Sequence, residues 1–227
     1  MVQNGRSIAG GGILNRPGST LTLNNSTVSG NTATSSNFGG GILNSGAVIL
    51  NNSIVNGNTG TGIHNNGSQT ILTLNNGSIS GNTSDGIYNE NGTLTMNNST
   101  ISNNMDNGLY NIGTAALNNS TVSGNVATIG GGIYNVVGPI TLQNTIIAGD
   151  CYNNTPYGAT ITSYGYNLIG NTSGCAFTPT TGDIVNVNPN LGPLIGFPSY
   201  LPLLPNSPAV DAGNPATCLV TDQRGVA

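Results

Sequence analysis

The repeat that decides the fold is clearest at residues 108–125, which read Gly-Leu-Tyr-Asn-Ile-Gly-Thr-Ala-Ala-Leu-Asn-Asn-Ser-Thr-Val-Ser-Gly-Asn. Its first four residues belong to a Gly-apolar-x-Asn motif that recurs with glycines 21 to 29 residues apart. The copies begin at Gly12, Gly41, Gly62, Gly86, Gly108 and Gly132. A period in the low twenties with short alternating apolar runs predicts a solenoid whose coils consist of strands, because helical repeats need longer amphipathic runs.

Two further apolar positions recur in every unit. An apolar residue such as Leu23 is followed five residues later by a β-branched residue such as Val28, and this spacing never varies. Each coil therefore reads as three short strands, and successive coils should stack about 4.8 Å apart as parallel sheets. We predict an all-β parallel β-helix with three strands per coil and about six regular coils. Residues 1–150 form the repeats, and residues 151–227 form a continuation or cap within the same structural unit.

Asparagine follows two positions after the apolar residue of the second strand in every unit. Amides stacked at the coil spacing can donate and accept hydrogen bonds along the axis, and asparagine tolerates the left-handed backbone of tight bends. We expect these residues to form an inward-facing structural ladder. Its members are Asn25, Asn52, Asn76, Asn98, Asn119 and Asn144. N-glycosylation is the alternative for some asparagines, although a repeat rich in Asn, Ser and Thr generates the Asn-x-Ser/Thr triplet by chance.

Gly-Gly-Gly-Ile-Tyr-Asn at 130–135 and Leu-Asn-Asn-Ser-Thr-Val-Ser-Gly-Asn at 117–125 resemble the secreted right-handed β-helix proteins of the pectate-lyase-like superfamily. Three later stretches resemble the bacterial cell-surface group called choice-of-anchor Q proteins. They read Gly-Tyr-Asn-Leu-Ile-Gly at 165–170, Ser-Pro-Ala-Val-Asp-Ala-Gly at 207–213 and Thr-Asp-Gln-Arg-Gly at 221–225. The resemblance implies a right-handed β-helix and an extracellular or cell-surface location, without a general activity. We expect the leader and anchor of such proteins to lie outside this chain.

Charge is scarce in this sequence. Only 4% of the residues are charged, whereas soluble proteins have about 25%. Lysine is absent, and the arginines are Arg6, Arg16 and Arg224. Such a chain lacks the basic surface that would bind nucleic acid or anionic lipid. It also lacks an apolar run of about 18 residues, so we expect no membrane insertion.

The cysteines suggest one crosslink. Cys151 and Cys175 flank a polar segment after the last regular coil, and an oxidising compartment would join them in a disulfide. Two buried free thiols are the alternative, and a metal site lacks both CxxC spacing and a neighbouring histidine. Cys218 is then left without an intramolecular partner.

Tyrosines occupy the outward position of the Gly-apolar-x-Asn motif. Tyr88, Tyr110 and Tyr134 form a possible binding stripe for sugar rings or another protein, unless they only stack on one another. Asp85 lies one residue before its motif glycine and Asp106 two before, so we expect these carboxylates not to share a column. No cation lies near them in the sequence. We therefore predict no catalytic residues, no cofactor and no metal.

These observations favour a non-enzymatic, extracellular or cell-surface structural or adhesive protein. Its expected partners are further copies of itself, joined head to tail in filaments, or a cell-surface polysaccharide. The alternative is a carbohydrate-binding module that uses the tyrosine face. A polysaccharide lyase or hydrolase and an ice-binding protein, the latter through hydroxyl columns that start at Thr27 and Ser29, are less favoured.

Overall fold

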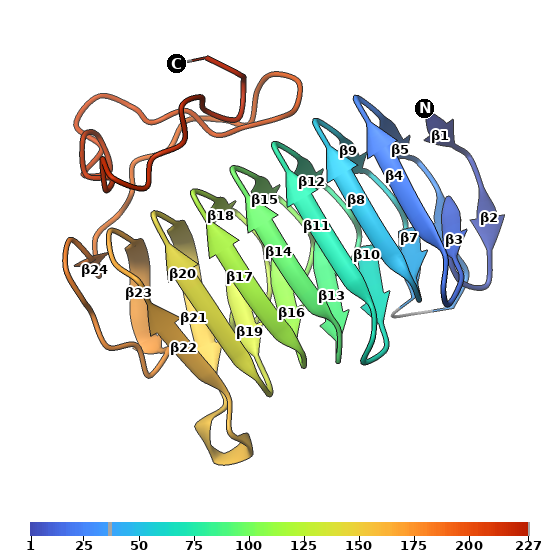
Figure 1. Ribbon diagram of the computed structural model, residues 1–227, viewed down its shortest axis with the longest axis horizontal. Helices are drawn as coiled ribbons and strands as arrows, with labels where there is room; N and C mark the ends of the chain where they lie inside the picture. The colour runs from blue at the N-terminus through green and yellow to red at the C-terminus, as the bar shows by residue number, and fades with distance from the viewer. Residues whose placement is uncertain (36–37, 227) are drawn as a thin grey trace.

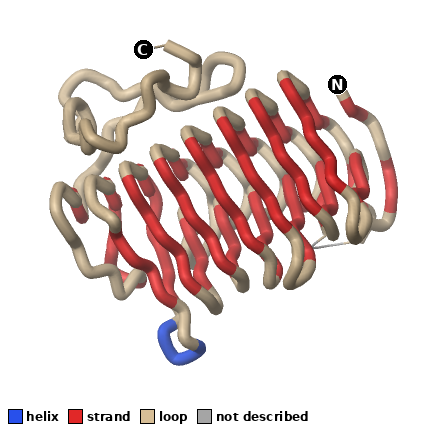
Figure 2. The backbone as a smooth tube through the Cα atoms, in the orientation of Figure 1, coloured by secondary structure: helices blue, strands red, loops and turns tan. Residues whose placement is uncertain are grey.

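The computed structural model describes residues 1–35 and 38–226 and shows a parallel β-solenoid of about seven turns (Figure 1). Nearly all of its regular structure is strand, and the short 3-10 helix η1 (Thr155–Tyr157) protrudes from one corner (Figure 2). Complete coils contribute strands to three faces. The expected all-β fold with three strands per coil is confirmed. No helix among the described residues has the length and apolar character needed to cross a membrane.

The first face bears the Gly-apolar-x-Asn motif. Its strands are β3 (Ile13–Asn15), β7 (Gly39–Asn44), β10 (Thr61–Asn66), β13 (Ile87–Glu90), β16 (Leu109–Asn111), β19 (Ile133–Asn135) and the end of β21 (Ile146–Asn153). Equivalent motif residues pair in register, as Tyr88 does with Tyr110.

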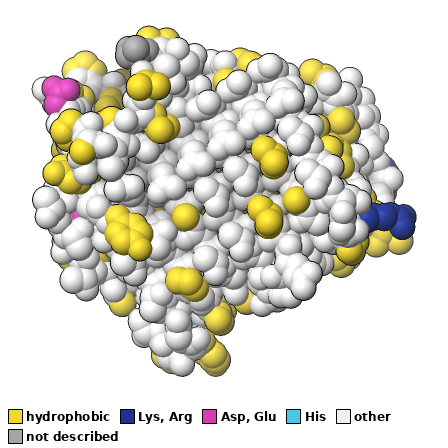
Figure 3. Space-filling view, viewed as in Figure 1, with side chains coloured by type: hydrophobic (Ala, Val, Ile, Leu, Met, Phe, Trp, Pro, Cys, Tyr) yellow, Lys and Arg dark blue, Asp and Glu magenta, His cyan; other side chains and the backbone are white. Residues whose placement is uncertain are grey.

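The second face is the most regular of the three. Its strands are β4 (Thr20–Asn24), β8 (Ala47–Asn51), β11 (Ile71–Asn75), β14 (Thr93–Asn97), β17 (Thr114–Asn118), β20 (Pro139–Gln143) and β22 (Thr160–Ser163). In β14, Leu94 and Met96 are fully buried while Thr93 is exposed, as the period of two requires. The outer surface of this face carries almost no charge, and its hydrophobic side chains are scattered (Figure 3).

The third face completes each coil. Its strands are β1 (Val2–Gln3), β5 (Thr27–Ser29), β9 (Ile54–Asn56), β12 (Ser78–Ser80), β15 (Thr100–Ser102), β18 (Thr121–Ser123), the start of β21, β23 (Leu168–Gly174) and β24 (Ile184–Val185). A separate pair joins β2 (Arg6–Ser7) to β6 (Thr32–Ala33).

Strand β21 continues the solenoid past the predicted end of the repeats. Ile146 and Ile147 pair with β18 on the third face, and residues 151–153 pair with β19 on the first. The division predicted between positions 150 and 151 therefore falls inside a strand, and the stacked coils extend to β24.

The motif glycines lie where adjacent coils approach most closely. A Cβ atom added to Gly108 would lie 2.7 Å from the carbonyl oxygen of Gly132 and 2.6 Å from Cγ1 of Val122. An added Cβ would come equally close to the carbonyl oxygen of the next motif glycine at Gly41, Gly62 and Gly86. The recurrence of glycine thus reflects contact between backbones rather than a turn.

The prediction for the asparagine ladder was correct for the backbone conformation but not for the position of the side chains. All six of its residues have a left-handed backbone, with φ between 47° and 53°. Asn25 and Asn52 are exposed, whereas Asn98 is buried and donates to Asn76 Oδ1 at 2.7 Å and to the carbonyl oxygen of Thr221 at 3.3 Å. The column therefore lies at a left-handed corner of the coil and does not form the continuous buried ladder that we expected.

Two other columns of asparagine form the inward ladders. The first uses the asparagine of the Gly-apolar-x-Asn motif, and its amides are buried and join Nδ2 to Oδ1 at 2.7 to 2.9 Å. Its members are Asn15, Asn44, Asn65, Asn89, Asn111, Asn135 and Asn153. The second follows the third strand and joins amides at 2.8 to 3.0 Å. Its members are Asn31, Asn58, Asn82, Asn104 and Asn125.

The segment from residue 186 to residue 226, here called the C-terminal arm, folds back along the solenoid instead of adding another coil (Figure 1). Gln223 accepts a hydrogen bond from Thr100 Oγ1 at 2.7 Å and donates one to the carbonyl oxygen of Gly77 at 2.9 Å. Thr100 and Ser78 are buried. The hydroxyl columns considered for ice binding are therefore covered in their middle part.

Candidate functional site

A row of aromatic rings runs along the first face, one ring per coil. The aromatic row consists of Phe38, His64, Tyr88, Tyr110, Tyr134 and Tyr152. His64 stacks flat on Tyr88 with centroids 4.6 Å apart, and the tyrosines then meet edge to face at 5.1 to 5.2 Å. The tyrosines of the predicted stripe do stack on one another, which was the alternative to a binding stripe. They also remain only half-buried, so they form an accessible surface.

Tyr152 belongs to this row although the sequence interpretation missed it. Its coil has Asp150-Cys151 in place of the usual Gly-Ile, so the motif search did not find it. The sequence feature that could have revealed Tyr152 is the pair Tyr152-Asn153, which repeats Tyr134-Asn135. The two pairs lie in register in the structure.

A groove of about 390 Å³ lies over three of these rings. We call it the tyrosine groove. Its lining residues are Tyr88, Tyr110 and Tyr134 together with Asp85, Asp106, Asn107, Ala127, Thr128 and Ile129. This volume lies within the range of small-molecule sites, about 300 to 1,000 Å³. The tyrosine groove is therefore large enough to receive a small polar ligand.

Two carboxylates converge at one wall of the tyrosine groove. The backbone N–H of Asn107 donates to Asp85 Oδ1 at 3.2 Å and to Asp106 Oδ1 at 3.1 Å. Asp85 and Asp106 do not share a column, as expected, because Asp85 lies opposite Asn107 in the register; the N–H of Asn107 nevertheless brings the two carboxyl groups together. Adjacent coils are only about 4.8 Å apart, so an offset of one residue along the strand does not separate them.

The environment of Asp85 disfavours its ionised form. Burial raises the pKa of the Asp85 carboxyl to about 7, and the neighbouring charge of Asp106 adds to the effect. The N–H groups that face it, including that of Asn107, oppose the shift. Near neutral pH the pair can therefore hold one proton, with Asp106 exposed to solvent.

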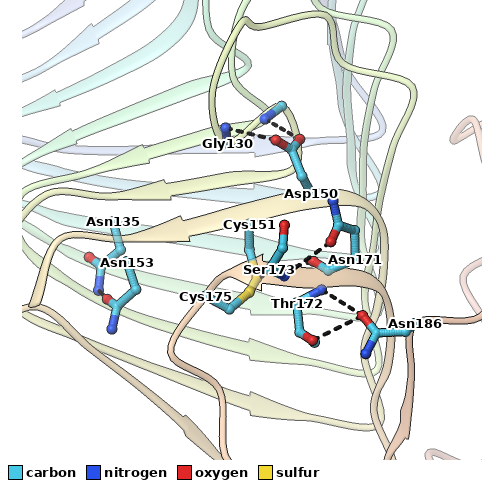
Figure 4. Close-up of a disulfide and its surroundings, with 11 residues drawn as sticks. Gly130, Asn135, Asp150, Cys151, Asn153, Asn171, Thr172, Ser173, Cys175 and Asn186 are labelled. Atoms are coloured by element: carbon cyan, nitrogen blue, oxygen red, sulfur yellow. Dashed lines mark hydrogen bonds between the residues drawn. A yellow bond between two sulfur atoms is a disulfide. The ribbon is translucent and has the colours of Figure 1, made fainter.

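The loop that carries Ile129 is held by two side chains that lie outside the predicted site residues. Asn107 Nδ2 donates to the carbonyl oxygens of Ile129 and Gly130 at 2.8 and 2.7 Å. Asp150 accepts from the N–H groups of Gly130 and Gly131 at 3.2 and 2.8 Å (Figure 4). The signal was Asp150 itself, which replaces asparagine in the second inward column.

His64 and Glu90 contact each other near one end of the aromatic row. His64 Nε2 lies 2.7 Å from Glu90 Oε2, and the imidazole is only 3% exposed. Burial lowers the pKa of His64, although Glu90 opposes the change. His64 is thus neutral at neutral pH and stacks as an uncharged aromatic ring.

No cationic side chain lines the tyrosine groove within the part of the chain that the structure describes. Arg224 lies on the C-terminal arm, where it pairs with Asp222 and stands 5.2 Å from the centre of the Tyr200 ring. Arg6 and Arg16 are exposed near the N-terminal coils. The field in the groove is therefore set by carboxylates.

The predicted disulfide between Cys151 and Cys175 is confirmed, with Cα atoms 5.1 Å apart (Figure 4). Cys151 takes the core position that isoleucine or leucine fills in other coils and pairs with Ile133. Cys218 is free and exposed on the C-terminal arm. Among residues 1–35 and 38–226, no group of three or more His, Cys, Asp and Glu side chains is arranged to hold a metal ion.

Comparisons with models of protein families, with curated proteins and with solved structures found no match to this chain.

Proposed function

We propose that this chain is a non-enzymatic adhesive protein of the cell surface or extracellular space, and that its tyrosine groove binds carbohydrate. One observation carries the proposal: three half-buried tyrosines on successive coils floor a groove whose wall holds two carboxylates. Sugar rings offer apolar C–H faces to aromatic rings and hydroxyl groups to polar acceptors. The tyrosine groove supplies both kinds of partner.

Two further features support the location. A disulfide is typical of proteins in oxidising compartments. The stretches at 165–170, 207–213 and 221–225 resemble choice-of-anchor Q proteins of bacterial cell surfaces, within the pectate-lyase-like superfamily. Head-to-tail assembly into filaments stays a prediction, which sedimentation at rising protein concentration tests.

A glycan array tests the binding. Tyr110→Leu is the informative variant because leucine occupies the same column at Leu14 and Leu43, so the coil should tolerate it. We expect Tyr110→Leu to weaken binding at least about tenfold, equivalent to about 1.4 kcal/mol. Tyr157→Ala, at an exposed tyrosine of η1, is the control and should bind as the wild type does. Equal binding by all three proteins would exclude the tyrosine groove as the site.

Glycoside hydrolysis is the second candidate, favoured by the carboxyl pair alone. Glycosidases use two carboxyl groups, one of them protonated at the working pH, and Asp85 with Asp106 meets that minimal requirement. Release of reducing ends from a bound glycan, abolished by Asp85→Asn, would establish this activity. Binding without release would support the adhesive function.

A further inference from the structure

Acidic side chains gather along the aromatic row. Asp85 and Asp106 line the tyrosine groove, and Glu90 ends β13 with its Oε2 2.7 Å from Nε2 of His64 in the same row. These are three of the seven acidic residues in the chain. Since no arginine lines the groove, a bound ligand meets negative potential with no compensating protein cation.

The remaining chemistry of the groove also suits a positive charge. The faces of tyrosine rings attract cations, and such contacts strengthen when water is excluded. Carboxylates accept hydrogen bonds but do not donate when ionised, whereas an ammonium group offers three donors and no acceptor. Asp106 is exposed at the groove, and Asp85 is nine-tenths buried there with only Oδ1 accepting from another described residue. A ligand carboxylate in the same place would meet like charges, which is unfavourable.

We infer that the tyrosine groove selects cationic saccharides, namely oligomers of sugars with free amino groups, over neutral and anionic ones. The inference rests on the proposed carbohydrate binding and adds the class of sugar. In the bound state an amino group lies against the carboxyl groups of Asp85 and Asp106, and the sugar rings lie along Tyr88, Tyr110 and Tyr134.

Calorimetry with three tetramers of equal length tests the selectivity. The probes are glucosamine, N-acetylglucosamine and galacturonic acid tetramers at pH 6 and moderate salt. We expect the glucosamine tetramer to bind at least about tenfold more tightly than the acetylated tetramer, equivalent to about 1.4 kcal/mol, and the galacturonic acid tetramer not to bind. Asp106→Asn should reduce that preference to threefold or less.

Asp211→Asn is the matched control, because it removes the same charge from an exposed site on the C-terminal arm. If it lowers affinity as much as Asp106→Asn does, the effect is one of net charge and the inference fails. If the acetylated tetramer binds as tightly as the amino tetramer, the inference also fails, although carbohydrate binding stands. If no saccharide binds, the proposed function fails as well.

A probe with fixed charge adds a pH readout. We expect an N-trimethylated glucosamine tetramer to bind more tightly as the pH rises from 6 to 8, because the pKa of Asp85 is about 7 and its ionisation adds a negative charge to the groove. The phenols of Tyr88 and Tyr110, which line the same groove, do not ionise over this range, since burial raises the pKa of both. Asp85→Asn should flatten the profile. A flat profile in the wild type would show that Asp85 does not face the ligand and would overturn the assignment.

Discussion

The inward ladder of motif asparagines makes a strong prediction about stability at Asn89. This side chain is fully buried, and its Nδ2 donates to Asn111 Oδ1 at 2.8 Å and to the carbonyl oxygens of Gly92 and Thr114 at 3.1 Å each. Its Oδ1 accepts from Asn65 at 2.8 Å. Asn89→Asp keeps the shape and the acceptor but replaces the donor with an oxygen. Losing three hydrogen bonds worth about 0.5 to 1.5 kcal/mol each should cost about 3 kcal/mol.

Asn119→Asp is the matched control from the outward column. Asn119 is only half-buried, its left-handed backbone suits aspartate, and its Oδ1 acts as an acceptor for Asn144, a role that a carboxylate retains. We therefore expect a loss below about 1 kcal/mol.

Urea denaturation followed by far-UV circular dichroism at pH 7 measures the stability of both variants. The midpoint concentrations of urea can be compared only if the free energy of unfolding depends on urea with the same slope in both variants. Equal losses, or a larger loss at Asn119, would refute the assignment of the motif column as the inward ladder.

The close approach of coils predicts that Gly108→Ala lowers stability by about 3 kcal/mol, because the added Cβ meets the carbonyl oxygen of Gly132 at 2.7 Å. Thermal melting should show this loss, while Gly57→Asn, at an open left-handed position, melts like the wild type; similar melting of both variants would contradict the packing argument. The burial of Asp85 predicts that stability falls as the pH rises from about 4 to 7, since the carboxyl ionises near 3.8 when unfolded but near 7 when folded. The difference between the two pKa values corresponds to a loss of about 4 kcal/mol in the free energy of unfolding. Denaturation at several pH values should show that Asp85→Asn removes this decline. If stability still falls with pH in the variant, other groups cause the decline.

Part of the candidate site could be predicted from the sequence. Tyr88, Tyr110 and Tyr134 share one position in the motif, so their common face followed from the repeat alone. The carboxyl pair did not follow, because Asp85 and Asp106 hold different positions in their repeats. Only the short distance between coils and the shared N–H of Asn107 bring them together.

By itself the sequence determined the local rules of this protein: three strands per coil, the left-handed corner at Asn25 and its equivalents, and the pairing of Cys151 with Cys175. These follow from fixed spacing and residue type, which act within one repeat or across one short loop. The tertiary structure decided which asparagines face inward and where the C-terminal arm lies, as Gln223 reaches Gly77 and Thr100. Which side chains face the core at a left-handed corner depends on how the chain turns there, and contact across the stack depends on coil spacing rather than on position in the repeat.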